Sequence, residues 1–113
     1  GGEQLRDFTY VDDCVEALLL AAASPATDGK TFNLGGGRTV NLAELARLVT
    51  DANGGGSFEV KQFPAERKRI DIGDYYADDR AFRSAVGWQP GVELEEGLRR
   101  TLAYYRQNMT HYL

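Results

Sequence analysis

The sequence predicts a mixed α/β domain of about four helices and three short strands that occupies residues 1–113. Three observations support this prediction. The chain opens with a strand-like alternation, apolar residues recur at helical spacing in longer stretches, and glycine, proline or polar runs separate these segments. A chain of 113 residues is also long enough to form one domain with a modest core.

The first strand and the first helix are expected to follow each other directly. Residues 5–11 alternate in the strand period, and one face carries Arg6, Phe8 and Tyr10. Asp12 offers an N-cap oxygen, and Asp13 places negative charge at the positive end of the helix. The apolar residues are numerous enough to bury this helix on most sides: Val11, Val15, Leu18, Leu19, Leu20 and Ala22. Ser24-Pro25 ends the helix.

The middle of the chain predicts two more strands around a second helix. Residues 30–34 are typical of a short strand, and the glycines at 35–37 form a loop. Asn41 and Glu44 have the spacing of a capping box, and Gly54 is typical of a helix end. Residues 58–63 predict a third strand, and residues 64–74 predict a polar loop.

Two helices are expected in the last third of the chain. Residues 79–86 predict a short helix, after which Gly87 can adopt the left-handed conformation and Trp88 can fold back on Phe82. The final helix begins near Leu94. Its charges form two pairs at i,i+4 spacing, namely Glu95–Arg99 and Glu96–Arg100.

Composition excludes several classes of function. A net charge of −4 disfavours sequence-independent binding of nucleic acid, which requires a positive surface. The longest apolar run, residues 15–23, is too short for a membrane span. The chain begins without a basic leader and contains one cysteine, Cys14, so a cytoplasmic protein is expected. With one cysteine and one histidine, we expect no metal cluster and no catalytic residues in this chain.

Three features are candidates for binding, and the residue pattern leaves each one open. Arg6 can bind a phosphate through two parallel N–H bonds, or it can pair with Asp7 or Asp12. The basic residues within 66–71 can supply a second phosphate contact, or they can be a solvated charge run. Tyr75 can stack on a base or sugar, or it can pack against the last helix. The glycines at 35–37 do not match the spacing of a dinucleotide-binding loop.

Four motifs, in order along nearly the whole chain, resemble the NAD-dependent epimerases and dehydratases. These enzymes are the extended short-chain dehydrogenase/reductase family that acts on nucleotide sugars. The first and most specific motif runs from Gly2 to Asp13 and is similar to G-x-Q-x-R-D-[FYW]-x-[YH]-V-x-D. The three others are weaker: Phe32-Asn33-Leu34-Gly35; Ala77-Asp78 with Val86-Gly87-Trp88-Gln89-Pro90; and Leu94-Glu95-Glu96-Gly97-Leu98.

The resemblance implies the C-terminal substrate-binding lobe of an extended Rossmann-type enzyme. It implies that Arg6 contacts the diphosphate of a nucleotide sugar and that Asp71 lies near the nucleotide. For the second phosphate contact we predict Arg69, with Lys68 as the alternative, because the family's R-x-G-D segment is altered here. Tyr75 matches a position that borders the nucleotide in some epimerases.

The same resemblance implies that the catalytic machinery lies in an N-terminal NAD-binding domain that this sequence does not contain. NAD would act in the full-length enzyme, and no NAD is expected on this fragment, which would be inactive alone. Its partners would be the nucleotide sugar and the missing domain, and without that domain the first helix would expose apolar surface and favour self-association. The alternative is a stand-alone module that binds a nucleotide sugar or a partner without catalysis.

Overall fold

The computed structural model describes residues 1–112 and confirms a mixed α/β fold within them. Two short strands form one antiparallel sheet, β1 (Leu5–Asp7) and β2 (Thr39–Asn41). The helices are α1 (Val11–Ala23), α2 (Leu42–Asn53), α3 (Ala65–Lys68), α4 (Arg80–Val86) and α5 (Leu94–Asn108). Short 3-10 turns follow α1 at Pro25–Thr27 and α5 at Met109–His111.

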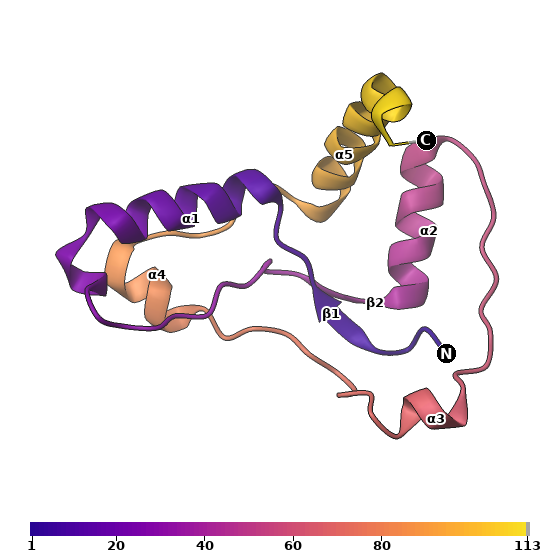
Figure 1. Cartoon of the computed structure of the whole chain (residues 1–113), viewed down its shortest axis with the longest axis horizontal. Helices are drawn as coiled ribbons and strands as arrows, with labels where there is room; N and C mark the ends of the chain where they lie inside the picture. Colours follow the sequence, from indigo (N-terminus) through magenta and orange to yellow (C-terminus); the bar gives the residue numbers. More distant parts are fainter. Residues whose placement is uncertain (113) are drawn as a thin grey trace.

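The elements form two packing units that meet at the small sheet (Figure 1). In the α1–α4 unit, α1 lies beside α4 around a core of Ala17, Phe82 and Trp88. The ring centroids of Phe82 and Trp88 lie 5.6 Å apart. Trp88 therefore folds back on Phe82 after the left-handed Gly87, as predicted. On the other side of the sheet, α2 packs against α5. The chain is therefore extended, with dimensions of 47 × 39 × 23 Å.

The sheet pairs the start of the chain with the segment that leads into α2. Leu5 lies opposite Asn41, Arg6 opposite Val40, and Asp7 opposite Thr39. The second strand was not expected here, and its central residue, Val40, is almost fully buried. The buried face of this strand ties the start of α2 to β1.

Two predicted strands do not form, and the first is shorter than expected. Residues 30–34 and 58–63 have no ladder partner in the described part of the chain, and β1 ends at Asp7 rather than at residue 11. A strand owes most of its stability to cross-strand pairs, so an apolar stretch without a partner remains irregular. In the predicted loop 64–74, a single helical turn forms instead as α3.

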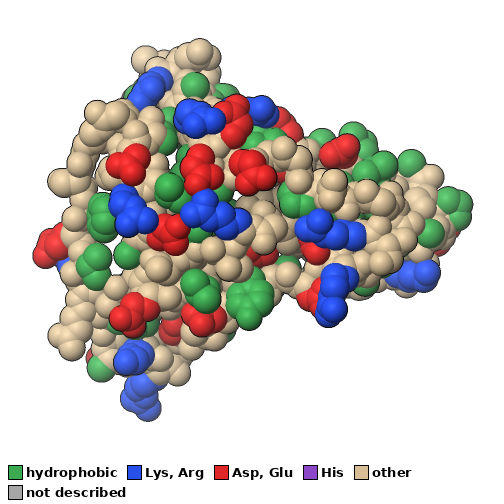
Figure 2. Space-filling view, turned by 180° about the vertical axis from the view of Figure 1, so that it is seen from behind, with side chains coloured by type: hydrophobic (Ala, Val, Ile, Leu, Met, Phe, Trp, Pro, Cys, Tyr) green, Lys and Arg blue, Asp and Glu red, His purple; other side chains and the backbone are tan. Residues whose placement is uncertain are grey.

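Helix α1 contradicts the expectation of burial on most sides. The exposed fractions of Val11, Leu18 and Leu19 are 61%, 63% and 67%, whereas Asp13 and Ala17 on another face are buried. Figure 2 shows hydrophobic side chains as green surface along the narrower arm of the molecule. The N-cap is Tyr10 rather than Asp12, without a side-chain cap. The α1–α4 unit therefore presents an apolar stripe outward.

The other helix ends follow the local signals. Asn41 Oδ1 accepts the N–H of Glu44 at 2.7 Å, and Gly54 ends α2 in the left-handed conformation. The Glu44 carboxylate binds Arg38, so the reciprocal bond of a capping box is not made. In α5, Glu96 pairs with Arg100 as predicted.

The other predicted pair of α5, Glu95–Arg99, is replaced by a contact between segments. Glu95 binds Arg38 in the loop before β2. Both Glu95 and Glu44 therefore share Arg38, and their hydrogen bonds raise the pKa of this guanidinium above its usual value. The two ion pairs connect α2 and α5 through the loop.

Candidate functional site

Arg6 leaves β1 with only part of its guanidinium engaged. Its Nη1 donates to the carbonyl oxygens of Leu5 at 2.7 Å and Gly73 at 2.6 Å. Its Nη2 lies 3.9 Å from Asp71 Oδ1, and 23% of the Arg6 side chain remains exposed. A guanidinium has five N–H donors. Within residues 1–112, the Nε–H and both Nη2–H groups make no hydrogen bond and can still receive an anion.

The segment 71–75 runs alongside β1 and brings Asp71 and Tyr75 next to Arg6. Leu5 accepts the N–H of Tyr75 at 3.0 Å, and its own N–H donates to Asp74 Oδ1 at 2.9 Å. A parallel bridge joins Arg6 to Tyr75. Asp71 closes the turn by accepting the N–H of Gly73 at 3.2 Å. The Tyr75 side chain is 53% exposed beside this bridge.

The ion pair expected for Arg6 forms with a different partner. Asp7 binds backbone N–H groups elsewhere, and Asp12 is exposed in the first turn of α1. Arg6 faces Asp71 instead, 65 residues further along the chain. The pair joins two of the residues that the resemblance named, because the segment after α3 returns to β1.

A cavity of about 370 Å³ reaches this pair at Asp71, whereas Arg6 is not among its lining residues. It is lined by Gly1, Glu3, Gln4, Phe63, Lys68, Asp71 and Asp74. Lys68, the last residue of α3, is on its wall; Arg69 follows α3, is exposed, and is not among the lining residues. Among the two candidates for a second cation, the cavity therefore holds Lys68.

Sequence reasoning missed the acceptor groups of this cavity. Gln4 Oε1 is buried and has no hydrogen-bond partner among residues 1–112. Gln4 precedes Arg6 by two residues, so the strand period could have placed both on one face. Glu3 and Asp74 add two carboxylates to the wall. The cavity is thus rich in acceptors and suits a ligand that carries hydroxyl or N–H donors.

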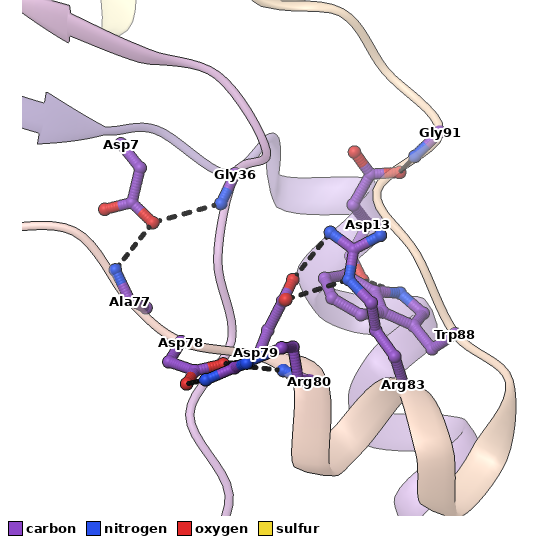
Figure 3. Close-up of polar contacts among 10 residues, drawn as sticks. All are labelled: Asp7, Asp13, Gly36, Ala77, Asp78, Asp79, Arg80, Arg83, Trp88 and Gly91. Atoms are coloured by element: carbon purple, nitrogen blue, oxygen red, sulfur yellow. Dashed lines mark hydrogen bonds and ion pairs between the residues drawn. The ribbon is translucent and has the colours of Figure 1, made fainter.

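Two acids of the first motif, Asp7 and Asp13, bind backbone N–H groups of distant segments (Figure 3). Asp7 Oδ2 accepts the N–H of Gly36 at 3.2 Å and that of Ala77 at 3.1 Å. Asp13, only 4% exposed, accepts the N–H of Gly91 at 3.0 Å and that of Val92 at 3.1 Å. Neither role was expected from the sequence, which assigned Asp13 only to the helix dipole.

Two aspartate–arginine ion pairs lie at the start of α4, also drawn in Figure 3. Asp79 binds Arg83 through both oxygens at 2.8 Å, and this contact raises the pKa of the Arg83 guanidinium. On the surface, hydrogen bonds from the Arg80 side chain and backbone N–H lower the pKa of Asp78 to about 2. These pairs lie at α4, and none of their residues lines the cavity described above.

Two further findings concern the residues that the structure describes. No group of three or more His, Cys, Asp or Glu side chains suited to a metal ion occurs among the described residues. No helix within them combines the length and the apolar character that a membrane crossing requires. Figure 2 shows basic and acidic side chains side by side over the broad part of one face.

Comparison with known proteins gives a consistent result. The family model described as GDP-mannose 4,6 dehydratase matches residues 1–101. The chain is 35% identical over 115 residues to UDP-glucuronic acid decarboxylase 1 of Xenopus tropicalis, covering 97% of this chain and 25% of that protein. It is 33% identical over 105 residues to UDP-glucose 4-epimerase of Mycolicibacterium smegmatis, covering 93% and 32%.

A solved structure shares the fold as well. The crystal structure of UDP-glucose 4-epimerase with UDP-glucose from Thermotoga maritima superposes with a TM-score of 0.83 at 35% identity, covering 96% of this chain and 33% of that one. The chain thus spans about a quarter to a third of the length of the proteins it matches.

Proposed function

Because the chain belongs to the GDP-mannose 4,6 dehydratase family, and with it to the NAD-dependent epimerases and dehydratases, we propose that it is the nucleotide-sugar-binding portion of such an enzyme. The observation that carries this proposal is Arg6, whose Nε–H and Nη2–H groups make no hydrogen bond and whose ion-pair partner, Asp71, lines the acceptor-rich cavity. UDP-glucose accompanies the epimerase of Thermotoga maritima, whose structure this chain resembles.

The polarity of the site orients the ligand. A diphosphate is repelled by the carboxylates of Glu3, Asp71 and Asp74, and it is attracted by the guanidinium of Arg6. Ribose hydroxyls and base N–H groups are donors, so the nucleoside fits the wall formed by these carboxylates and Gln4 Oε1. The diphosphate therefore lies on the Arg6 side, and the nucleoside enters the cavity.

A second cation completes the phosphate contact. Arg69 is the predicted residue and Lys68 the alternative; Lys68 lines the cavity, where it is nearer to the nucleoside wall, and Arg69 does not. Arg69 reaches the same anion if α3, a helix of a single turn, shifts when the ligand binds. Tyr75 borders the ligand beside the Arg6 bridge, where its exposed ring is available for stacking.

The glycines at 35–37 do not form a binding loop for NAD. A dinucleotide loop opens at a helix N-terminus, but the glycines at 35–37 lead into β2. A Cβ atom on Gly36 would lie 2.0 Å from the carbonyl oxygen of Phe8, so this glycine serves a close backbone crossing. We therefore place NAD and the catalytic groups in another part of the enzyme, and we expect no turnover by this chain alone.

The exposed apolar face of α1 supports the proposal that an NAD-binding domain lies in another part of the enzyme. Val11, Leu18 and Leu19 form an outward apolar face on an otherwise charged surface. An NAD-binding domain packed on this face would bury it. In the absence of that domain, a second copy of the chain covers the face.

A binding titration tests the proposal. UDP-glucose, dTDP-glucose and GDP-mannose are titrated against the 113-residue chain by calorimetry, in parallel with Arg6→Ala. We expect one of the ligands to bind and Arg6→Ala to lose about tenfold to a hundredfold in affinity, because a charge-assisted hydrogen bond is removed. The control is Arg47→Ala, which removes the same charge from the exposed face of α2.

The outcomes separate the proposal from its rival. Equal affinity of the wild-type chain and Arg6→Ala contradicts a phosphate site at Arg6. Turnover of a bound sugar after addition of NAD contradicts a purely binding role. A stand-alone binding module predicts a start codon directly before Gly1, whereas a lobe of a larger enzyme predicts a glycine-rich loop and a Tyr-x-x-x-Lys motif upstream in the same reading frame.

A further inference from the structure

Three distant segments of the chain meet at one oxygen atom of Asp7. Asp7 Oδ2 accepts the N–H of Gly36 in the loop before β2 and the N–H of Ala77 in the stretch before α4. These residues are 29 and 70 positions away along the chain. Figure 3 shows both bonds converging on the carboxylate at the end of β1.

The crossing is tightly packed. Gly35 is buried, and a Cβ atom on it would lie 3.2 Å from Asp7 Oδ2 and 3.3 Å from the carbonyl oxygen of Ala77. Gly36 lies so close to Phe8 that only glycine fits. The two N–H groups are therefore held against the carboxylate by backbone contacts on several sides, which limits how the junction can rearrange.

In chain order, Asp7 makes the last of the attachments that hold segment 71–77 on β1, which also include the Leu5 N–H to Asp74 bond and the Arg6–Asp71 ion pair. Arg6 holds the carbonyl of Gly73, Leu5 holds the N–H of Tyr75, and Asp7 holds the N–H of Ala77. Successive strand residues point to opposite faces, so Arg6 and Asp7 reach the segment from two sides. No residue between 71 and 77 belongs to a helix or to a named strand. Its path therefore depends on these bonds.

We infer that Asp7 is a positioning residue of the site, because its carboxylate fixes the C-terminal end of the segment that carries Asp71 and Tyr75. The inference rests on the proposed function for its effect on ligand affinity. The hydrogen bonds themselves do not depend on that function. When the Ala77 attachment is removed, the Tyr75–Leu5 bond becomes the last hydrogen bond between β1 and the stretch that leads into α4. The Arg6–Asp71 geometry loosens with this stretch.

Asp13 provides a matched control for a purely structural role. Like Asp7, it accepts two backbone N–H groups, but those of Gly91 and Val92 in the α1–α4 unit. It contacts neither β1 nor the segment 71–77. Removal of either carboxylate lowers the stability of the fold, whereas only removal of the Asp7 carboxylate changes the position of Asp71 and Tyr75.

The experiment compares Asp7→Ala, Asp7→Asn and Asp13→Ala in the 113-residue chain. The first readout is amide hydrogen exchange of Tyr75, measured by NMR without ligand. The second is the dissociation constant for UDP-glucose. For Asp7→Ala we expect exchange about tenfold faster and affinity about tenfold weaker, which corresponds to the loss of one charge-assisted hydrogen bond. Asp7→Asn keeps an acceptor oxygen and recovers part of both effects, and Asp13→Ala changes neither.

Each outcome decides one of the two claims. Wild-type exchange of Tyr75 in Asp7→Ala, or an equal effect of Asp13→Ala on exchange, overturns the positioning role. If the wild-type chain binds none of the nucleotide sugars, the proposed function fails, and the exchange readout alone still decides the role of Asp7. If Asp7→Ala does not fold, the comparison is made between Asp7→Asn and Asp13→Asn.

Discussion

The Nη1 atom of Arg6 lies 2.6 Å from the carbonyl oxygen of Gly73, 67 residues further along the chain. The Nη2 atom of the same guanidinium faces Asp71 at 3.9 Å, and the Nε–H and Nη2–H groups make no hydrogen bond within residues 1–112. Arg6 thus orders the segment beside it before any ligand arrives. A site whose parts are already in place loses less conformational entropy when the ligand binds.

Arg6→Lys should loosen this segment. A lysine ammonium keeps the charge, but it cannot hold two carbonyl oxygens with one nitrogen and still offer a planar pair of donors. We expect a loss of about 1–2 kcal/mol in the free energy of unfolding, measured by urea denaturation. Arg47→Lys on the exposed face of α2 should change it by less than about 0.5 kcal/mol. Equal values for the two variants would contradict the bond to Gly73.

Asp13→Ala should destabilise the α1–α4 unit. The change leaves the N–H groups of Gly91 and Val92 without their acceptor. We expect a cost of about 2–3 kcal/mol, followed through the fluorescence of Trp88, the only tryptophan in the chain. Asp12→Ala removes the same charge from the same helix turn, where the side chain is exposed, and should cost much less. Similar costs would show that the helix dipole dominates.

Gly36→Ala should disrupt the junction at the end of β1. Its Cβ would lie 2.0 Å from the carbonyl oxygen of Phe8, and two backbone segments would have to separate. We expect a loss of at least about 3 kcal/mol, measured by thermal unfolding. Gly91→Ala is the control, because its Cβ would meet Asp13 Oδ1 at an ordinary 3.6 Å. A stable Gly36→Ala variant would show that the two segments are not in contact.

Asp78 should titrate well below the ordinary value of an aspartate in an NMR pH titration. Hydrogen bonds from Arg80 lower the pKa of this carboxyl from 3.8 to about 2. A depressed pKa in the folded state means that the pair stabilises the fold above about pH 4, and that this stabilisation is lost as the pH falls through about 2. Arg80→Ala should return the pKa of Asp78 toward 3.8. High salt should raise it in the wild-type chain, since both groups are exposed.

The stripe on α1 should make the isolated chain self-associate. Leu18→Glu places a charge in the middle of this apolar face, where Leu18 is 63% exposed. We expect sedimentation velocity to show dimers or larger species for the wild-type chain and a shift to monomer for the variant. Gln107→Glu adds the same charge on the exposed side of α5 and should leave association unchanged. A monodisperse wild-type monomer would refute this expectation.

Helix ends were predictable because their signals are local. Asn41 caps α2, Gly54 and Gly87 end two helices, and Trp88 packs on Phe82, all through residues no more than six positions apart. Strands were predicted less well. Residues 58–63 have the composition of a strand, but pairing requires a partner segment that no local pattern specifies. The unexpected strand β2 forms by pairing with β1, in which Val40 lies opposite Arg6.

The sequence alone determined the order of its motifs and most helix ends, although not the N-cap of α1. These helix ends follow from residue types at short spacing, whereas the resemblance carried by the motifs named Arg6, Asp71 and Tyr75 as the residues to examine. The tertiary structure decided which groups meet: Arg6 with Gly73, Asp7 with Ala77, and Asp13 with Gly91. Each of these bonds spans at least 67 residues, and in each the partner is a backbone group, which every residue carries. No side-chain pattern can therefore identify that partner before the chain has folded.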